Sequence, residues 1–267
     1  MTKVLIFDCD GVLADTERYG HLVAFNQMWR ELGVPWQWSV KEYGRKLMIG
    51  GGKERMASLF HEPEFLAVFR PPDSEEERKT LIALWHQRKT AIYKDIISSG
   101  KIPARSGVRR LSEEALDKGW TLAVASTSAQ ESVDAVLRRA VGEETSKRFS
   151  LVLAGDAVKI KKPAPDIYIL AARKLGVSSQ ECVVMEDSRN GLLAATRAGM
   201  KCVVTVSDYT KEEDFSEAVI VLTCLGDAGG EQCEVLANHG PASPGECFSA
   251  DDLEMVLSGQ EAEGIRR

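Results

Sequence analysis

The stretch IFDCDGVLADT, residues 6–16, runs from an apolar segment directly into a group of aspartates. Asp8, Asp10 and Asp15 follow the segment KVLIF (3–7), whose composition predicts a buried strand. Like charges that gather at the end of a buried strand repel one another and cost desolvation energy. We therefore expect either a cation or a reaction that uses carboxylates at this point of the chain.

Short apolar segments recur along the chain and alternate with patterns of helical periodicity. These segments are KVLIF (3–7), TLAVA (121–125), SLVLA (150–154), CVVM (182–185), KCVVTV (201–206) and AVIVL (218–222). Such alternation is typical of a parallel sheet with helices on both faces. The sequence therefore predicts a doubly wound α/β core.

One long interval, residues 15–93, interrupts this alternation. It is rich in helical patterns and contains four of the five tryptophans. We predict a helical cap domain inserted after the first strand, with the core formed by residues 1–14 and 94–267. Near the C-terminus, residues 226–247 are predicted as a loop. The run FSADDLEMVL (248–257) is predicted as a final helix with Ser249 as its N-cap.

Composition and charge limit the classes of partner. With 44% hydrophobic and 28% charged residues, the chain is typical of a soluble globular protein, and its net charge of −6 disfavours nucleic acids and anionic membranes. No targeting segment is visible, and no apolar run is long enough to span a bilayer. Six cysteines without C-x-x-C spacing suggest buried thiols in a reducing compartment, although Cys233 and Cys247 could pair. We expect a monomer.

Polar residues follow four of the predicted strands. In open parallel sheets, ligands bind beyond the carboxyl ends of the strands, so these residues are expected to lie close together. They are Asp8 and Asp10 after 3–7, Ser126, Thr127 and Ser128 after 121–125, Lys161 and Lys162 in the loop that follows 150–154, and Glu186 and Asp187 after 182–185. Of the two lysines, we expect Lys162, directly before Pro163, to be the functional one.

This set of side chains suits the hydrolysis of a phosphate ester. Asp8, Glu186 and Asp187 could hold Mg²⁺, which prefers oxygen ligands and keeps positions for water and a substrate phosphate. The donors for the phosphoryl oxygens would be Ser126, Thr127 and Lys162. An aspartate such as Asp8 can attack phosphorus, and a carboxylate two residues on, Asp10, can protonate the leaving oxygen and then activate water.

These residues also carry a family resemblance. The runs DCDGVLADT (8–16), KPAPDIY (162–168) and EDSRNG (186–191), together with Ser126, resemble the four signatures of the haloacid dehalogenase (HAD) superfamily in its phosphatase form. The resemblance implies a Rossmann-like core with Asp8 as nucleophile, Asp10 as general acid/base, Ser126 and Lys162 as further catalytic residues, and Mg²⁺ bound by Asp8, Asp10, Glu186 and Asp187. Dehalogenases proper lack the second aspartate, so Asp10 argues against that branch.

Three further runs resemble the CbbY-type proteins within this superfamily: DTERYGHLVAFN (15–26), IGGGKERM (49–56) and YTKEEDF (209–215). CbbY-type proteins are xylulose-1,5-bisphosphate phosphatases that remove an inhibitor of Rubisco in plants, algae and bacteria. The resemblance implies a sugar-bisphosphate substrate. It also implies a location in the chloroplast stroma or, alternatively, in the bacterial cytoplasm.

The cap domain supplies candidates for the substrate contacts. They are Glu17, His21, Tyr43, Gly50, Gly51, Gly52, Lys53 and Arg55, with Thr127 in the core. The glycines followed by Lys53 and Arg55 suit a loop that meets an anion near the start of a helix. Each candidate has a structural alternative: His21 could be a core histidine, and Lys53 and Arg55 could be a solvated helical face.

The sequence also permits other interpretations of these residues and of the function. Asp10 with Gly11 could only initiate a turn, and Glu17 could be an N-terminal helix charge. The same aspartyl-phosphate chemistry also serves phosphomutases, in which cap closure excludes water. A binding protein without turnover is a third class, disfavoured by the intact set of catalytic residues.

Overall fold

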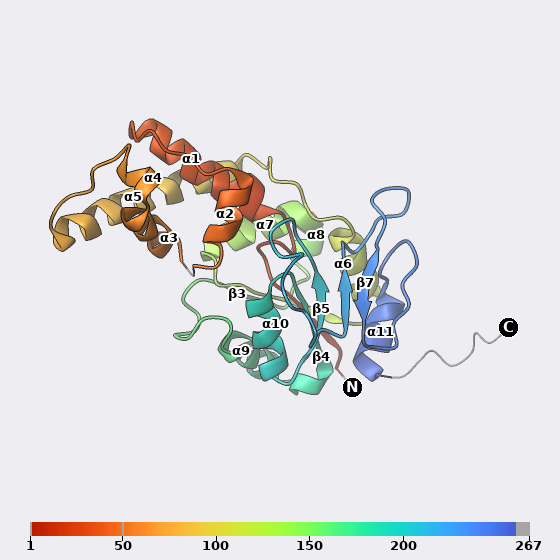
Figure 1. Ribbon diagram of the computed structural model, residues 1–267. Coiled ribbons are helices and arrows are strands. Elements are labelled where there is room, and N and C mark those ends of the chain that lie inside the picture. Colours follow the sequence, from red (N-terminus) through yellow and green to blue (C-terminus); the bar gives the residue numbers. More distant parts are fainter. Residues whose placement is uncertain (1, 50, 260–267) are drawn as a thin grey trace. The chain divides into compact units, whose positions relative to one another are not determined.

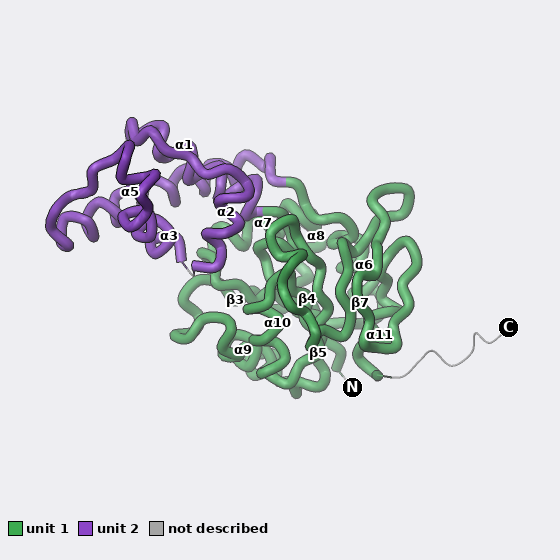
Figure 2. Tube along the Cα trace, viewed as in Figure 1, with its two compact units in different colours: residues 1–15, 103–267 green, residues 16–102 purple. Residues whose placement is uncertain are grey.

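The computed structural model of the chain describes residues 2–49 and 51–259. The chain forms two compact units: a helical unit of residues 16–102, and a core unit of residues 1–15 and 103–267 (Figure 2). The boundary predicted between residues 93 and 94 falls inside helix α5 (Glu75–Ser98). This helix continues beyond residue 93 because Ile97 is buried and extends its apolar face.

The core unit contains a seven-stranded sheet in the order β3-β2-β1-β4-β5-β6-β7 (Figure 1). The strands are β1 (Val4–Phe7), β2 (Thr121–Ala125), β3 (Leu151–Leu153), β4 (Cys182–Glu186), β5 (Lys201–Thr205), β6 (Ile220–Leu222) and β7 (Val235–Asn238). All neighbours pair in parallel except β6 and β7. The six predicted strands are confirmed. Since β2 and β4 flank β1, the strand order reverses beside β1, and the end of β1 is the expected place for a ligand.

Helices cover both faces of the sheet, which confirms the doubly wound architecture. They are α6 (Val108–Asp117), α7 (Gln130–Val141), α8 (Glu143–Ser146), α9 (Asp166–Leu175), α10 (Arg189–Arg197) and α11 (Ala250–Ser258). On one face, Val4 and Ile6 of β1 share a buried cluster with Ile167 of α9 and Leu192 of α10. On the other, α6 contacts β2, α7 and α11.

The segment 226–247 is not only a loop, so that prediction was wrong for β7. Val221 of β6 pairs with Ala237 of β7, and this pairing across the sheet forms the strand. The Arg110 guanidinium of α6 anchors the same region by donating hydrogen bonds to the carbonyls of Leu225, Gly226 and Phe248. All six cysteines, including Cys233 and Cys247, are free thiols.

The helical unit is built around aromatic side chains. It consists of a π-helical turn (Glu17–His21), α1 (Leu22–Glu31), α2 (Val40–Lys46), α3 (Gly52–Ser58), a 3₁₀ turn (Leu59–His61), α4 (Pro63–Leu66) and α5. Trp29 and Trp38 meet edge to face with ring centroids 4.6 Å apart, and Trp29 also contacts Trp85 of α5. Such pairs add specific contact energy to the area they bury, and they fix the helices against one another.

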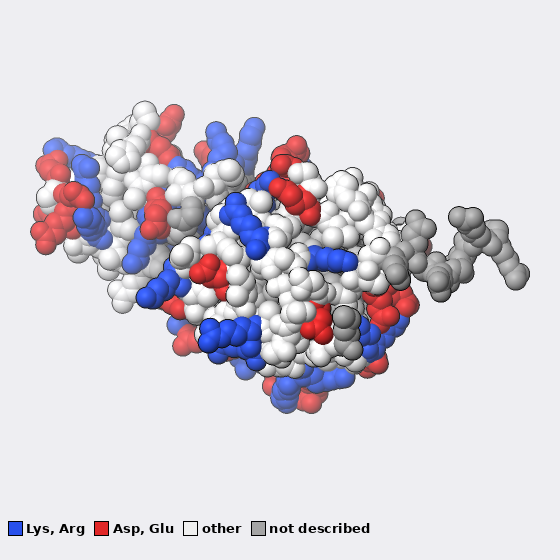
Figure 3. Space-filling view, turned by 90° about the horizontal axis from the view of Figure 1, so that it is seen from below, with Lys and Arg blue, Asp and Glu red and all other residues white. Residues whose placement is uncertain are grey.

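The last helix, α11, begins as predicted, because the Ser249 hydroxyl accepts a hydrogen bond from the Asp252 amide. Across the described part of the chain, no helix combines the length and the apolar character needed to cross a membrane. Acidic and basic side chains are interspersed on the face drawn in Figure 3.

Candidate active site

Three buried carboxylates meet at the ends of β1 and β4. The Asp8 amide donates to the Met185 carbonyl at 3.0 Å, which continues the pairing of the two strands to their carboxyl ends. Asp8, Glu186 and Asp187 are all buried, and each offers an oxygen within 4.8 Å of the others. The strand-end clustering that the sequence predicts is therefore present for these three residues.

Lys162 neutralises part of this charge. Its Nζ donates to Asp8 Oδ1 at 2.8 Å, to Glu186 Oε1 at 2.7 Å and to the Ala125 carbonyl at 3.2 Å. The neighbouring Lys161 instead reaches Asp156 at 2.9 Å and the Gly155 carbonyl, at the surface. Of the two lysines, only Lys162 contacts the carboxylates of the cluster, and its functional role stays a prediction.

Burial and charge act against each other in this cluster. Burial raises the pKa of Asp8 from its ordinary 3.8 to about 7, because Lys162 opposes the rise only in part and Glu186 and Asp10 add to it. Burial alone would lower the pKa of Lys162, but the Asp8 and Glu186 carboxylates outweigh it and raise that pKa above its usual range. The ammonium group therefore stays charged and favours the ionised form of its partners.

Two glycines leave room for the carboxylates. Gly11 has a φ of +79°, and a Cβ there would lie 2.0 Å from Asp187 Oδ2. A Cβ on Gly191 would lie 1.9 Å from the Glu186 carboxyl carbon. Any larger residue at either position would displace an acidic side chain of the cluster.

Asp10 lies at the edge of the cluster and is partly buried. Its Oδ2 accepts a hydrogen bond from the Ser128 hydroxyl, and it does not belong to the three-carboxylate set. Its predicted role as a metal ligand therefore stays a prediction. Ser126 is buried at the end of β2, where its Oγ accepts from the Ser128 amide at 3.2 Å, whereas Thr127 is exposed.

The donor set fits a hard divalent cation. Three carboxylates with oxygens within a few ångströms of one another match the all-oxygen coordination that Mg²⁺ prefers. The cluster holds three acidic groups against one lysine, so an additional cation would balance its charge. The residues present are thus compatible with the predicted metal.

In the helical unit, three of the predicted substrate residues contact one another. The Tyr43 hydroxyl donates to Glu17 Oε2 at 2.5 Å and accepts from Arg55 Nη1 at 3.1 Å, while Arg55 Nη1 lies 3.9 Å from the same Glu17 oxygen. Arg55 Nε also donates to the Ile49 carbonyl at 3.0 Å. This network shows that Arg55 is not simply a solvated cation.

His21 belongs to a second network of the same unit. Its Nδ1 lies 2.5 Å from Nζ of the buried Lys89, and its ring stacks on Tyr93 at 3.9 Å between centroids. Burial lowers the pKa of His21 well below 6.5, and the charges of Lys89 and Arg55 lower it further. Since Lys89 can only donate, a neutral His21 accepts through Nδ1.

The remaining cap candidates lie around the start of α3. Lys53 is exposed and, among the residues that the structure describes, makes no ion pair or hydrogen bond, in contrast to Arg55. Gly51 adopts a φ of +95° before the helix, Gly52 begins it, and Gly50 lies outside the described residues. The structure therefore leaves the ammonium group of Lys53 available to a ligand.

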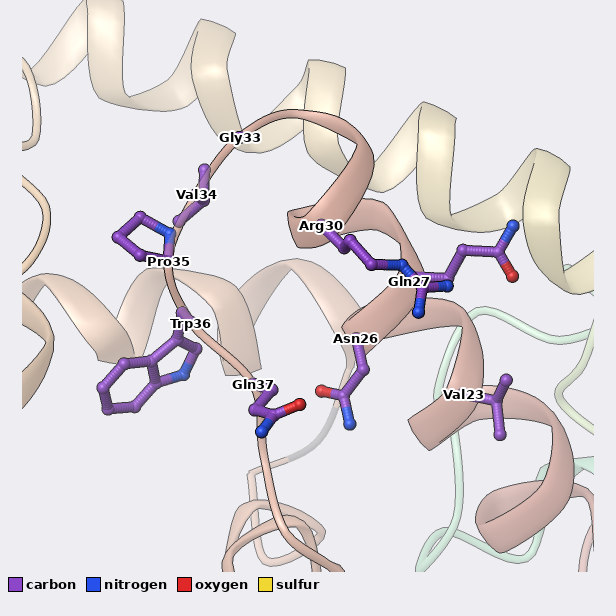
Figure 4. A pocket seen from close by; sticks show the side chains of 9 residues that line it. All are labelled: Val23, Asn26, Gln27, Arg30, Gly33, Val34, Pro35, Trp36 and Gln37. Atoms are coloured by element: carbon purple, nitrogen blue, oxygen red, sulfur yellow. The ribbon is translucent and has the colours of Figure 1, made fainter.

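A surface pocket of the helical unit, about 660 Å³ in volume, lies beside the end of α1 (Figure 4). Its lining residues are Val23, Asn26, Gln27, Arg30, Gly33, Val34, Pro35, Trp36 and Gln37. These do not include any of the substrate candidates. The Asn26 side chain is already paired with the backbone of Trp38, and we assign no role to this pocket.

Comparison with known proteins places the chain in a family. Residues 2–199 match the haloacid dehalogenase-like hydrolase family. The chain belongs to the haloacid dehalogenase-like hydrolases. Over 238 residues, this hydrolase is 44% identical to a CBBY-like protein of Arabidopsis thaliana, an alignment that covers 88% of the chain and 73% of the relative.

Solved structures give the same relationship. The crystal structure of CbbY from Rhodobacter sphaeroides in complex with phosphate is 38% identical to this hydrolase, with a TM-score of 0.72, and the match covers 84% of this chain and 95% of that one. A variant of that CbbY, crystallised in complex with xylulose-(1,5)bisphosphate, matches with a TM-score of 0.71 at the same identity and coverage. The hydrolase is a phosphatase of the CbbY type.

Two residues of these networks were missed by reasoning from the sequence: Tyr168 and Lys89. Ser128 was expected among the strand-end residues after 121–125, but no role was predicted for it. Lys89 lies four residues after Trp85 and four before Tyr93, on the buried stripe of α5, where a lysine is unusual. Tyr168, whose hydroxyl donates to Glu186 Oε1, gave no signal beyond its place at the end of KPAPDIY.

Proposed function

We propose that this phosphatase hydrolyses xylulose 1,5-bisphosphate in a Mg²⁺-dependent reaction through an aspartyl-phosphate on Asp8. The observation that carries the chemistry is the buried Asp8 carboxylate, held by Lys162 beside two further carboxylates. The substrate follows from the similarity to the CbbY that was crystallised with that bisphosphate. In a plant or alga the reaction would take place in the chloroplast stroma, and in a bacterium in the cytoplasm.

In the first step, Asp8 attacks the phosphorus atom. Its Oδ1 accepts from Lys162, so Oδ2 is the oxygen with lone pairs to spare for the new oxygen–phosphorus bond. As the bond between phosphorus and the sugar oxygen breaks, Asp10 gives its proton to that oxygen. The hydrogen bond that Ser128 donates to Oδ2 of Asp10 holds this carboxyl group in position.

In the second step, the same Asp10, now ionised, removes a proton from water. The resulting hydroxide attacks phosphorus and breaks the bond to Asp8, which releases inorganic phosphate and restores both aspartates. Lys162 lies next to the Asp8 carboxylate, and Ser126 directly follows β2. Both can donate hydrogen bonds to phosphoryl oxygens.

Glu186 and Asp187, with Asp8, would hold the Mg²⁺ ion. When bound, the ion supplies positive charge to the phosphoryl oxygens and to the nucleophilic carboxylate. Each of the three residues has an oxygen close enough to the others for one cation. Because burial raises the pKa of Asp8, a nearby cation would favour the ionised form that the attack requires.

The phosphate that does not react needs cations of its own. We assign this role to Lys53, with Arg55 as the second candidate, because Lys53 is exposed and has no partner among the described residues. Arg55 already serves Tyr43 and Ile49, so it would bind the anion while holding those contacts. Glu17, His21, Tyr43, Gly51, Gly52 and Thr127 remain proposed substrate contacts.

Product analysis tests the reaction class. The enzyme is incubated with xylulose 1,5-bisphosphate, and inorganic phosphate and sugar phosphates are quantified with and without a chelator. We expect one phosphate released per molecule of substrate, loss of turnover on chelation and recovery on adding Mg²⁺, with Ca²⁺ a poor substitute. An isomerised bisphosphate without free phosphate would indicate a mutase, and full activity after exhaustive chelation would exclude the metal.

A further inference from the structure

Tyr168 lies beside the proposed catalytic cluster, but no step of the proposed reaction uses it. It lies on α9 and is fully buried. Its hydroxyl donates to Oε1 of Glu186, and its ring centroid is 4.9 Å from Nζ of Lys162. Tyr168 thus contacts both the Lys162 ammonium group and the Glu186 carboxylate of the cluster.

The two oxygens of Glu186 have different surroundings. Oε1 accepts from the Tyr168 hydroxyl and from Lys162 Nζ, so both of its lone pairs are occupied. Oε2 accepts only a long contact, 3.3 Å, from the Asp187 amide among the described residues. The carboxylate is therefore divided, with one oxygen committed to the protein and the other able to bind a cation.

The surroundings of Glu186 also fix its orientation. The residue is 1% exposed, and its carboxylate fills the space in which a Cβ of Gly191 would otherwise lie. Rotation of the carboxylate group would exchange the two oxygens, and the Tyr168 hydroxyl opposes it, because a phenol can donate to only one oxygen at a time. Lys162 alone is a weaker constraint, since an ammonium group has no fixed donor plane.

We infer that Tyr168 is a positioning residue for the metal site: by holding Oε1 of Glu186, it presents Oε2 to Mg²⁺. This inference rests on the proposed use of Mg²⁺. Hydrogen-bond partners of metal ligands orient those ligands, and their loss typically weakens metal binding by about ten- to a hundredfold. The Tyr168→Phe variant keeps the ring beside Lys162 and removes only the hydroxyl.

The test is a titration of the full chain with MgCl₂ in the absence of substrate, in which the melting temperature is measured at each MgCl₂ concentration. The proteins are the wild type, Tyr168→Phe, the matched control Tyr19→Phe, and Asp187→Asn. Tyr19 is 45% exposed and lies in the helical unit, so its variant loses a tyrosine hydroxyl that is not part of the carboxylate cluster. Asp187→Asn shows whether the shift reports this metal site.

We expect half-saturation at about tenfold higher Mg²⁺ for Tyr168→Phe, no change for Tyr19→Phe, and loss of the shift for Asp187→Asn. A purely structural role predicts a lower melting temperature without Mg²⁺ but unchanged half-saturation. Half-saturation within twofold of the wild type would therefore overturn the inference. A wild type whose melting temperature does not respond to Mg²⁺ would instead remove the proposed metal site, and the inference with it.

Discussion

Replacing Lys162 with methionine removes the cation that, in the described part of the chain, contacts both Asp8 and Glu186. The lysine side chain is 11% exposed and donates to these carboxylates at 2.8 and 2.7 Å. Removing one partner of a buried ion pair leaves an uncompensated charge and typically costs about 3–5 kcal/mol of stability. We expect a loss of this size in the free energy of unfolding at pH 8, together with loss of turnover.

The loss of stability in Lys162→Met should depend on pH, and the direction of this dependence follows from the pKa of Asp8. In the folded state this pKa is raised from 3.8 to about 7, so the folded protein binds more protons than the unfolded chain in that interval and loses stability as pH rises. Without Lys162, the pKa rises further and the interval extends upward. The deficit relative to wild type should therefore be larger at pH 8 than at pH 5.

Urea unfolding of both proteins at pH 5 and pH 8 measures this. Lys161→Met is the matched control, because the neighbouring lysine pairs with the fully exposed Asp156 and its loss should change stability little at either pH. A Lys162→Met deficit below about 1 kcal/mol, or one equal to that of Lys161→Met, would refute the buried-charge argument. A large deficit that does not change with pH would show that the titration of Asp8 is not the cause.

Three further predictions concern the nucleophile, the cap histidine and the cap lysine. Asp8→Asn should lose nearly all turnover yet bind the sugar bisphosphate in calorimetry, and comparable kcat would remove Asp8 as nucleophile. His21 is kept neutral in the folded state, so below pH 6.5 protons bind the unfolded chain at this residue and favour unfolding. Between pH 7.5 and 5.5, the free energy of unfolding of the wild type should therefore fall by up to about 1.4 kcal/mol more than that of His21→Gln. Parallel pH dependences in urea unfolding would contradict this. Lys53→Ala should lower kcat/KM for the bisphosphate about ten- to a hundredfold while sparing p-nitrophenyl phosphate, and an equal loss on both esters would point to misfolding.

Most of the core fold could be predicted because its strands are buried on both faces. A strand such as CVVM reads as a continuous apolar run, and parallel pairing follows from the helical patterns between such runs. β7 escaped prediction because Val235 and Leu236 are about half exposed and the strand forms through its pairing with β6. Because β6 lies elsewhere in the chain, pairing with it leaves no strand periodicity in the sequence of β7 itself.

The site could be predicted as far as strand ends determine it. Asp8, Lys162, Glu186 and Asp187 come together because parallel strands bring their carboxyl ends to one edge. The contact of Tyr168 with Glu186 depends instead on how α9 packs on the sheet, which sequence spacing does not give. Lys89 shows the same limit in the helical unit, since only packing reveals that its ammonium group faces His21.

We propose that this hydrolase removes phosphate from a sugar bisphosphate and prefers xylulose 1,5-bisphosphate. The most direct test is a screen of sugar mono- and bisphosphates in the presence of Mg²⁺, with inorganic phosphate release as the readout and kcat/KM as the measure. We predict the highest kcat/KM for xylulose 1,5-bisphosphate and much lower values for the monophosphates, which lack the second anion. Equal or better use of a monophosphate, or no phosphate release from any bisphosphate, would contradict the account.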